Sequence, residues 1–231
     1  MVLMSDLNSA ASQAAITSVL GPSVLGPSVL NQGASKSTSL GYLASGHEPE
    51  QSYYRGTQQQ YARLGMALGH YLDLEQGYTQ AGLDRLLNCQ AIHLAGGDTF
   101  QFLAQVQKRG LMAEFADYLN RGGILIGLSA GAMLMTPSIA CAPLCGDENH
   151  LGLSDLDGMG LLPYQFLPHG DLSDGGVALS VRAACLLEAA SLAEYPLILC
   201  GDEDAVVATK AGLRGFGQPL LFDGVSLMSL V

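Results

Sequence analysis

One serine of the sequence lies in a setting typical of a nucleophile. Ser129 falls within residues 127–132 (Gly-Leu-Ser-Ala-Gly-Ala), where the apolar run 123–128 ends and a helix is expected to begin. A serine on such a tight turn projects its hydroxyl into solvent, and flanking glycines remove Cβ atoms that would clash. The N-terminus of the following helix favours an anion formed on attack. The pattern predicts a nucleophile elbow; a turn of small residues packed between strand and helix is the alternative.

A serine hydroxyl needs a base within hydrogen-bonding reach, and histidine is the usual one. His169 follows the apolar residues 161–167, a predicted strand. If that strand is parallel to the one before Ser129, both residues lie at the same edge of the sheet. His169 is therefore the predicted base, with a structural loop histidine as the alternative. Of the other histidines, His93 lies in a predicted core strand and His150 in an acidic loop. His47 and His70 lie in early segments without a carboxylate-rich partner loop.

A second glycine-rich turn, residues 95–100 (Ala-Gly-Gly-Asp-Thr-Phe), also follows a predicted strand and opens a predicted helix. In a doubly wound sheet this turn lies beside the serine turn, so its backbone N–H groups and that of Ala130 are expected to stabilise an oxyanion. A phosphate cradle is the alternative, but the turn has neither a GxGxxG pattern nor a GK[ST] ending.

The elements that must position these turns follow the pattern of βαβ units. Short apolar runs alternate with amphipathic stretches from residue 39 onward, and the run 123–128 is apolar throughout, as a central parallel strand must be. We predict strands at 2–4, 40–44, 66–72, 91–94, 123–128, 161–167 and 197–200, and edge hairpins formed by 205–209, 212–216 and 219–222. We predict helices at 9–20, 49–64, 80–87, 100–107, 111–120 and 176–190.

This order of elements predicts one α/β domain, residues 1–231, built as a three-layer sandwich with a mostly parallel central sheet. Residues 1–38 form an atypical N-terminal segment in which Val-Leu-Gly-Pro-Ser is repeated. Gly-Pro pairs interrupt regular structure, so residues 21–38 are expected to be a surface connection.

Composition narrows the classes of partner. The 231 residues carry a formal net charge of −11, which disfavours nucleic acid and anionic membranes as partners. Five cysteines without a CxxC pair fit neither a disulfide framework nor a zinc site, and the N-terminus lacks a basic segment typical of a secretory signal. We therefore expect a cytoplasmic protein with no metal. Whether it forms a homodimer stays open.

Three motifs in one order carry a family resemblance: the two glycine turns and Leu167-Pro168-His169. Together they resemble the serine peptidase family of dipeptidase E (aspartyl dipeptidase) and cyanophycinase, whose fold is similar to that of class I glutamine amidotransferases. The resemblance covers about residues 39–210 and leaves the N-terminal repeat outside. It implies a dipeptidase-like or exopeptidase-like hydrolase that cleaves short peptides through an acyl-enzyme and needs no cofactor.

The resemblance also implies roles for single residues. The acid of the catalytic triad is expected in the loop between the serine and the histidine, and Asp147 is our prediction for it. Glu148, next to it, and Asp171, two residues after the histidine, are the alternatives. The resemblance implies that Ser129 is the nucleophile and His169 the base. The N–H groups of Gly97 and Ala130 are then the donors of the oxyanion hole.

One departure from the family concerns specificity. In aspartyl dipeptidases a basic segment follows the catalytic histidine and contacts the substrate's N-terminal aspartate, whereas residues 170–177 here are acidic and glycine-rich. An acidic mouth suits a cationic side chain or a free α-amino group. The residues that we expect to bind substrate are Asp98, Thr99, Arg182 and Glu203.

The sequence also fits other functions. A cyanophycinase-like activity fits the same motifs. An α/β-hydrolase esterase or amidase shares the elbow and the Ser, Asp, His order, but that fold normally inserts further strand and helix units where this chain has forty residues between Ser129 and His169. A non-catalytic binding protein on the same fold is the alternative outside the enzymes.

Overall fold

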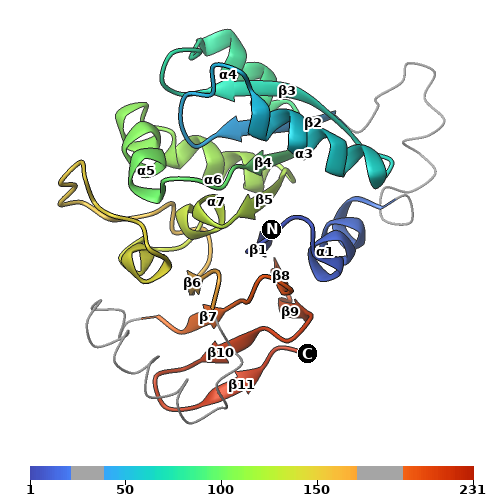
Figure 1. Ribbon diagram of the computed structural model, residues 1–231, viewed down its shortest axis with the longest axis vertical. Helices are drawn as coiled ribbons and strands as arrows, with labels where there is room; N and C mark the ends of the chain where they lie inside the picture. Colours follow the sequence, from blue (N-terminus) through green and yellow to red (C-terminus); the bar gives the residue numbers. More distant parts are fainter. Residues whose placement is uncertain (22–38, 171–194) are drawn as a thin grey trace.

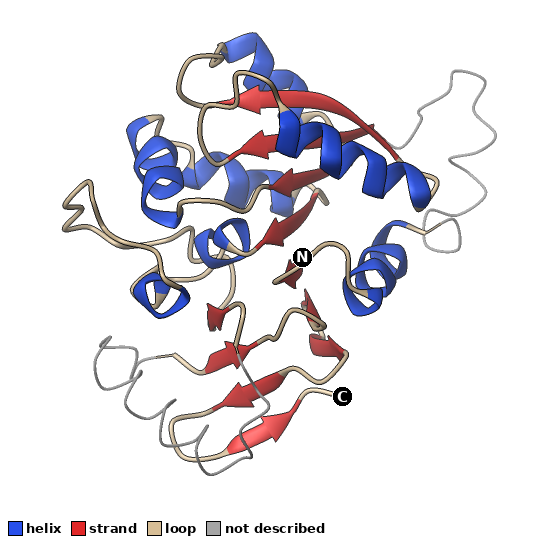
Figure 2. Ribbon diagram, viewed as in Figure 1, coloured by secondary structure: helices blue, strands red, loops and turns tan. Residues whose placement is uncertain are grey.

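The structure is a computed structural model that describes residues 1–21, 39–170 and 195–231, and these form two β-sheets (Figures 1 and 2). The central sheet has the order β3-β2-β4-β5-β1-β8-β9. Its strands are β3 (Ala67–Asp73), β2 (Ser39–Ala44), β4 (Ala91–Leu94), β5 (Ile124–Leu128), β1 (Val2–Met4), β8 (Ala205–Thr209) and β9 (Gly212–Phe216). Neighbours from β3 to β1 pair in parallel, whereas β8 and β9 are antiparallel. The predicted mostly parallel sheet is confirmed.

A second sheet of four strands has the order β11-β10-β7-β6 and lies below the central sheet in Figure 1. Its strands are β11 (Leu227–Ser229), β10 (Leu220–Phe222), β7 (Leu197–Leu199) and β6 (Gln165–Leu167). The predicted strand 161–167 is wrong in its length, because only its last three residues are extended, and these pair in parallel with β7 in the second sheet and not in the sheet of β5. Pro163, which has no N–H to donate, precedes the part that pairs.

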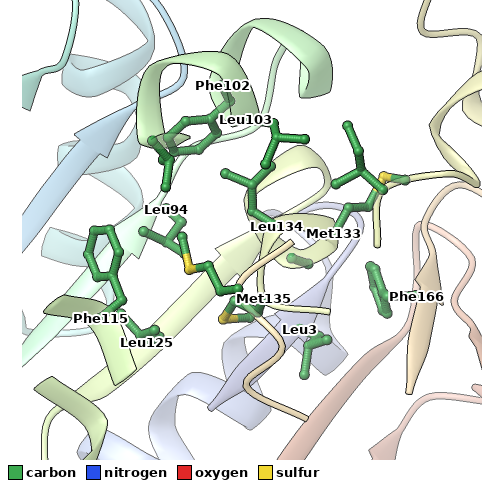
Figure 3. Close-up of a cluster of buried hydrophobic side chains, with 14 of the residues drawn as sticks. Leu3, Leu94, Phe102, Leu103, Phe115, Leu125, Met133, Leu134, Met135 and Phe166 are labelled. Atoms are coloured by element: carbon green, nitrogen blue, oxygen red, sulfur yellow. The ribbon is translucent and has the colours of Figure 1, made fainter. Parts of the chain in front are cut away.

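Helices cover both faces of the central sheet, as the three-layer prediction requires (Figure 2). On one face, α1 (Ala10–Leu20) and α3 (Ser52–Arg63) enclose an apolar cluster with β1, β2, β4 and β5. On the other, α4 (Gln80–Leu87), α5 (Thr99–Lys108), α6 (Met112–Asn120) and α7 (Ala130–Leu134) enclose a larger one. Figure 3 shows part of this larger core, where side chains such as Leu94, Phe102 and Met135 are buried.

Local chemistry explains where several helices begin. Ser9, Thr79 and Asp98 are N-caps whose side chains accept a hydrogen bond from the N–H three residues on, in α1, α4 and α5. The predicted connection 21–38 and the predicted helix 176–190 lie almost wholly in the segments 22–38 and 171–194, outside the described residues. In the part of the chain that is described, no helix has the length and apolar character to span a membrane.

Candidate active site

Ser129 lies between β5 and α7 in a backbone conformation that few residues other than glycine adopt. Its φ is 48° and its ψ −107°, and its N–H donates to the carbonyl oxygen of Met4 over 2.8 Å. A Cβ atom on Gly127 would lie only 2.5 Å from Cα of Ala132, and one on Gly131 would overlap the backbone of Leu94. Strain of this kind persists where the surrounding structure enforces it, often at functional sites. The geometry is that of the predicted nucleophile elbow.

The second glycine turn lies beside this elbow because β4 and β5 are parallel neighbours. Leu94 pairs with Gly127, and the N–H of Gly131 donates to the carbonyl oxygen of Ala95 over 3.1 Å. Among the described residues, no acceptor takes the N–H of Gly97 or of Ala130. Both N–H groups are therefore free of a partner in the described part of the chain, and an oxyanion hole at this place stays a prediction.

The imidazole of His169 reaches the serine across the ends of the two sheets. Its Nε2 lies 2.9 Å from Oγ of Ser129, and the residue itself has a positive φ of 56°. Its N–H donates to Oγ of Ser5, just after β1, over 3.2 Å, and the hydroxyl of Ser5 donates to the carbonyl oxygen of Cys200, just after β7. Three strand ends thus hold the histidine, although β6, which precedes it, is not in the sheet of β5.

The other ring nitrogen of His169 meets a carboxylate from the turn after β7. Nδ1 lies 2.6 Å from Oδ1 of Asp202. The turn is held by Asp204, a buried residue whose carboxylate accepts the N–H groups of Gly201 and Gln218 over 2.9 and 2.6 Å. With the Nδ1 proton donated to Asp202, Nε2 has a free lone pair for the hydroxyl proton of Ser129.

Asp147 does not occupy the position predicted for the acid. Its Oδ2 accepts the backbone N–H of Thr99 over 3.1 Å, so it lies at the N-terminus of α5, where the unpaired N–H groups attract an anion. Asp202 is paired with the histidine instead. Of the two alternatives, Glu148 is exposed and lies 3.4 Å from Nε2 of His150, and Asp171 lies outside the described residues.

The serine and the histidine line a cavity of about 650 Å³. Four carboxylates also line it, Asp6, Glu48, Asp98 and Asp202, whereas none of its described lining residues is a lysine or an arginine. A further histidine, His47, lies on the same cavity. In the described segments, no group of histidine, cysteine and carboxylate side chains is arranged to hold a metal ion.

The four residues expected to bind substrate fall into different places. Asp98 lines the cavity while its Oδ1 caps α5. Thr99 is buried, and its N–H is taken by Asp147, so it is not part of the cavity wall. Glu203 lines a different cavity, next to Asp202, and Arg182 lies outside the described residues.

The remaining histidines show what sequence reasoning predicted and what it missed. His93 is buried as expected, and burial lowers its pKa to about 3. His70 and His150 are exposed. The prediction for His47 is wrong, because Asp73, 26 residues further on, lies 2.6 Å from its Nδ1. The missed signal is that His47 comes shortly after the predicted strand 40–44 and Asp73 directly after the predicted strand 66–72. Parallel pairing of these two strands brings both residues to one edge of the sheet.

Comparison with known proteins finds a matching family model and similar proteins. The model of peptidase family S51 matches residues 31–214. Peptidase E of Salmonella arizonae is 38% identical over 89 residues, which are 38% of this chain and 38% of that protein. Peptidase E of Escherichia coli O1:K1 / APEC is 38% identical over 82 residues, 36% of this chain and 34% of that protein. The matched stretch therefore spans little more than a third of these curated relatives.

Solved structures extend the likeness over nearly the whole chain. A candidate peptidase E from Listeria monocytogenes EGD-e superimposes with a TM-score of 0.68 at 16% identity, covering 93% of this chain and 96% of that one. A peptidase from an acI-B1 actinobacterium gives a TM-score of 0.68 at 18% identity, covering 100% and 93%. At such identities the likeness concerns the fold.

Proposed function

Because the chain belongs to peptidase family S51, we propose that it is a serine peptidase that hydrolyses short peptides. In this proposal Ser129 is the nucleophile, His169 is the general base and Asp202 orients the histidine. The observation that carries it is the 2.9 Å contact between Oγ of Ser129 and Nε2 of His169, made by a serine on a strained turn that faces a cavity. An active-site serine needs this contact, whereas a serine that serves only packing does not.

The first half of the reaction forms an acyl-enzyme. Oγ of Ser129 attacks the peptide carbonyl carbon while Nε2 of His169 takes the hydroxyl proton. The carbonyl oxygen becomes an oxyanion, which accepts hydrogen bonds from the N–H groups of Gly97 and Ala130. The C–N bond then breaks, His169 gives its proton to the leaving nitrogen, and the amine product departs from a serine ester.

The second half reverses these roles with water. His169 takes a proton from a water molecule, whose oxygen attacks the ester carbonyl. Collapse of the second tetrahedral intermediate releases the carboxylic acid, and the proton on His169 returns to Oγ of Ser129. Throughout, Asp202 holds the Nδ1 proton and stabilises the imidazolium that forms twice in each cycle.

The test is hydrolysis of a dipeptide library with varied N-terminal residues. Ser129→Ala is expected to lower turnover at least about 10³-fold, because the nucleophile is gone while the fold remains. Ser154→Ala is the matched control, since Ser154 is an exposed serine away from the cavity, and it should keep wild-type turnover. Thermal unfolding checks that both variants fold.

Three outcomes would contradict the proposal. Wild-type turnover by Ser129→Ala would remove the serine from the mechanism. Cleavage of p-nitrophenyl esters without cleavage of any dipeptide would favour an esterase. A folded wild-type protein that hydrolyses neither class would favour a binding protein.

A further inference from the structure

The cavity that holds Ser129 has a second imidazole–carboxylate pair on its wall. His47 follows β2, and its Nδ1 lies 2.6 Å from Oδ2 of Asp73, the last residue of β3. Asp73 is only 3% exposed, and its Oδ1 accepts the N–H groups of Glu75 and Gln76 over 2.6 and 3.3 Å. Three hydrogen bonds thus fix this carboxylate, and the carboxylate fixes the plane and position of the His47 ring.

The backbone of His47 is held as firmly as its ring. Its N–H donates to Oε2 of Glu75 over 2.8 Å, and Oε1 of Glu75 accepts from Nε2 of Gln101 over 2.8 Å. The side chain of His47 is nevertheless 31% exposed, and its Nε2 makes no hydrogen bond with another described residue. A preorganised imidazole with one unoccupied nitrogen therefore belongs to a residue that lines the cavity of Ser129 and His169.

We propose that His47 binds substrate: its Nε2 accepts a hydrogen bond from an ammonium group of the peptide, either the N-terminal amine or a cationic side chain. This inference rests on the proposed function, since it names the substrate class of the same cavity. His47 is a specificity-determining residue in it, and Asp73 is a positioning residue that acts through His47.

The direction of the hydrogen bond follows from the pairing with Asp73. A carboxylate accepts only, so the proton of a neutral imidazole lies on Nδ1, and Nε2 is left with its lone pair. An N–H donor on the substrate is the complement of that lone pair. A substrate carboxylate has no proton to offer it at neutral pH.

The charge of the cavity favours the same class of group. Its wall carries Asp6, Glu48, Asp98 and Asp202. Glu48 is next to His47 in the chain, and its two oxygens are held by the hydroxyl of Tyr42 over 3.0 Å and the N–H of Tyr54 over 3.2 Å. An ammonium group has three N–H donors, enough for Nε2 of His47 and for neighbouring carboxylates, whereas an acidic side chain would meet like charge.

The competing explanation is that His47 and Asp73 merely link the loops after β2 and β3. Asp73→Asn separates the two, because the asparagine can keep its Oδ1 on the N–H groups of Glu75 and Gln76. Its Nδ2 then donates to Nδ1 of His47, which moves the ring proton to Nε2. This variant keeps the link and turns the acceptor on the cavity wall into a donor.

Binding is tested in the Ser129→Ala background, so that it can be measured whether or not the chain hydrolyses peptides. The ligand is the dipeptide Lys-Ala, titrated by calorimetry. His47→Phe and Asp73→Asn are each expected to raise its Kd about tenfold, the lower end of what one hydrogen bond to a charged group contributes. ¹⁵N chemical shifts of the His47 ring should show the proton on Nδ1 while Asp73 is present and on Nε2 in the Asp73→Asn variant.

Kinetics with the natural Ser129 gives the second measurement. For lysyl dipeptides, His47→Phe should raise KM about tenfold with kcat within about twofold, and hydrolysis of p-nitrophenyl acetate, which has no amine, should not change. His150→Phe is the matched control, because His150 also lies near a carboxylate, Glu148, but not on the cavity. It should leave all these values unchanged.

Each contrary result overturns a separate claim. An unchanged Kd for Lys-Ala in both variants removes His47 from binding, whatever the turnover. Equal losses on dipeptides and p-nitrophenyl acetate make the pair structural. The dipeptide Asp-Ala is titrated in the same way. A loss of affinity for Asp-Ala without a loss for Lys-Ala would mean that a protonated His47 binds carboxylates. A failure of the proposed function would instead appear as absent hydrolysis by the wild-type chain, with the Kd differences intact.

Discussion

The two imidazole–carboxylate pairs on the cavity have the same spacing and different surroundings. Nδ1 lies 2.6 Å from a carboxylate oxygen in both, yet Asp202 is 61% exposed and Asp73 only 3%. Nε2 of His169 meets a serine hydroxyl, whereas Nε2 of His47 has no partner among the described residues. The pair alone therefore does not define a catalytic site, and the contact on the far side of the ring decides its chemistry.

The difference in burial separates function from stability. Asp202 makes no other hydrogen bond within the described residues, so its carboxylate serves His169 alone. Asp73 also closes the turn after β3 through the N–H groups of Glu75 and Gln76. Replacing Asp202 should change the reaction and spare the fold, whereas removing Asp73 should weaken both substrate binding and the fold.

The largest effect expected within this comparison is that of Asp202→Asn on turnover. An asparagine can donate to Nδ1, which leaves the proton on Nε2 and removes the base that Ser129 needs. We expect kcat for dipeptides to fall about 10²- to 10³-fold. The loss is smaller than for a buried triad carboxylate, because water can partly take over the role of an exposed one. The measurement is steady-state hydrolysis of the best library dipeptide.

Asp147→Asn is the control for that experiment. Its carboxylate accepts a hydrogen bond from the N–H of Thr99 and does not contact His169, so turnover should stay within about threefold of wild type. If Asp147→Asn lost more activity than Asp202→Asn, the acid would have to be reassigned to the loop between Ser129 and His169.

A smaller effect separates the two carboxylates by stability. Asp73→Ala should lower the free energy of unfolding by about 1–3 kcal/mol, because it removes a buried side chain and leaves the part-buried N–H groups of Glu75 and Gln76 without their acceptor. Asp202→Ala should change it by less than about 0.5 kcal/mol, as is usual for an exposed side chain. Urea unfolding followed by circular dichroism measures both, and equal losses would erase the distinction between the pairs.

Much of the fold and half of the site are predictable because their signals are local. Ser129 and the two glycine turns are marked by glycines that prevent clashes, and β4 and β5 are short apolar runs with turns at both ends. Parallel pairing of these strands then brings the turns that contain Gly97 and Ala130 to the same edge of the sheet. His169 was found for a partly wrong reason, since β6 belongs to the other sheet.

The carboxylate that pairs with His169 was not predictable, because its place depends on pairing between distant segments. Asp202 is 33 residues from His169, and it reaches the ring only because β6 and β7 pair in parallel in the second sheet. Asp147 lies between Ser129 and His169 in the sequence, as expected of the acid, but its carboxylate accepts the N–H of Thr99 at the N-terminus of α5. His47 and Asp73 likewise meet through the register of β2 and β3, which pairs Ala44 with Asp73.

Labelling with a fluorophosphonate, followed by peptide mapping, tests the central claim most directly. The reagent phosphonylates a serine only when a base activates it. The account predicts a single adduct on Ser129 in the wild-type chain, much slower labelling of Asp202→Asn, and wild-type labelling of Asp73→Asn and Asp147→Asn. An adduct on another residue, or none on a folded protein, would contradict the assignment of Ser129, His169 and Asp202 as the reactive set.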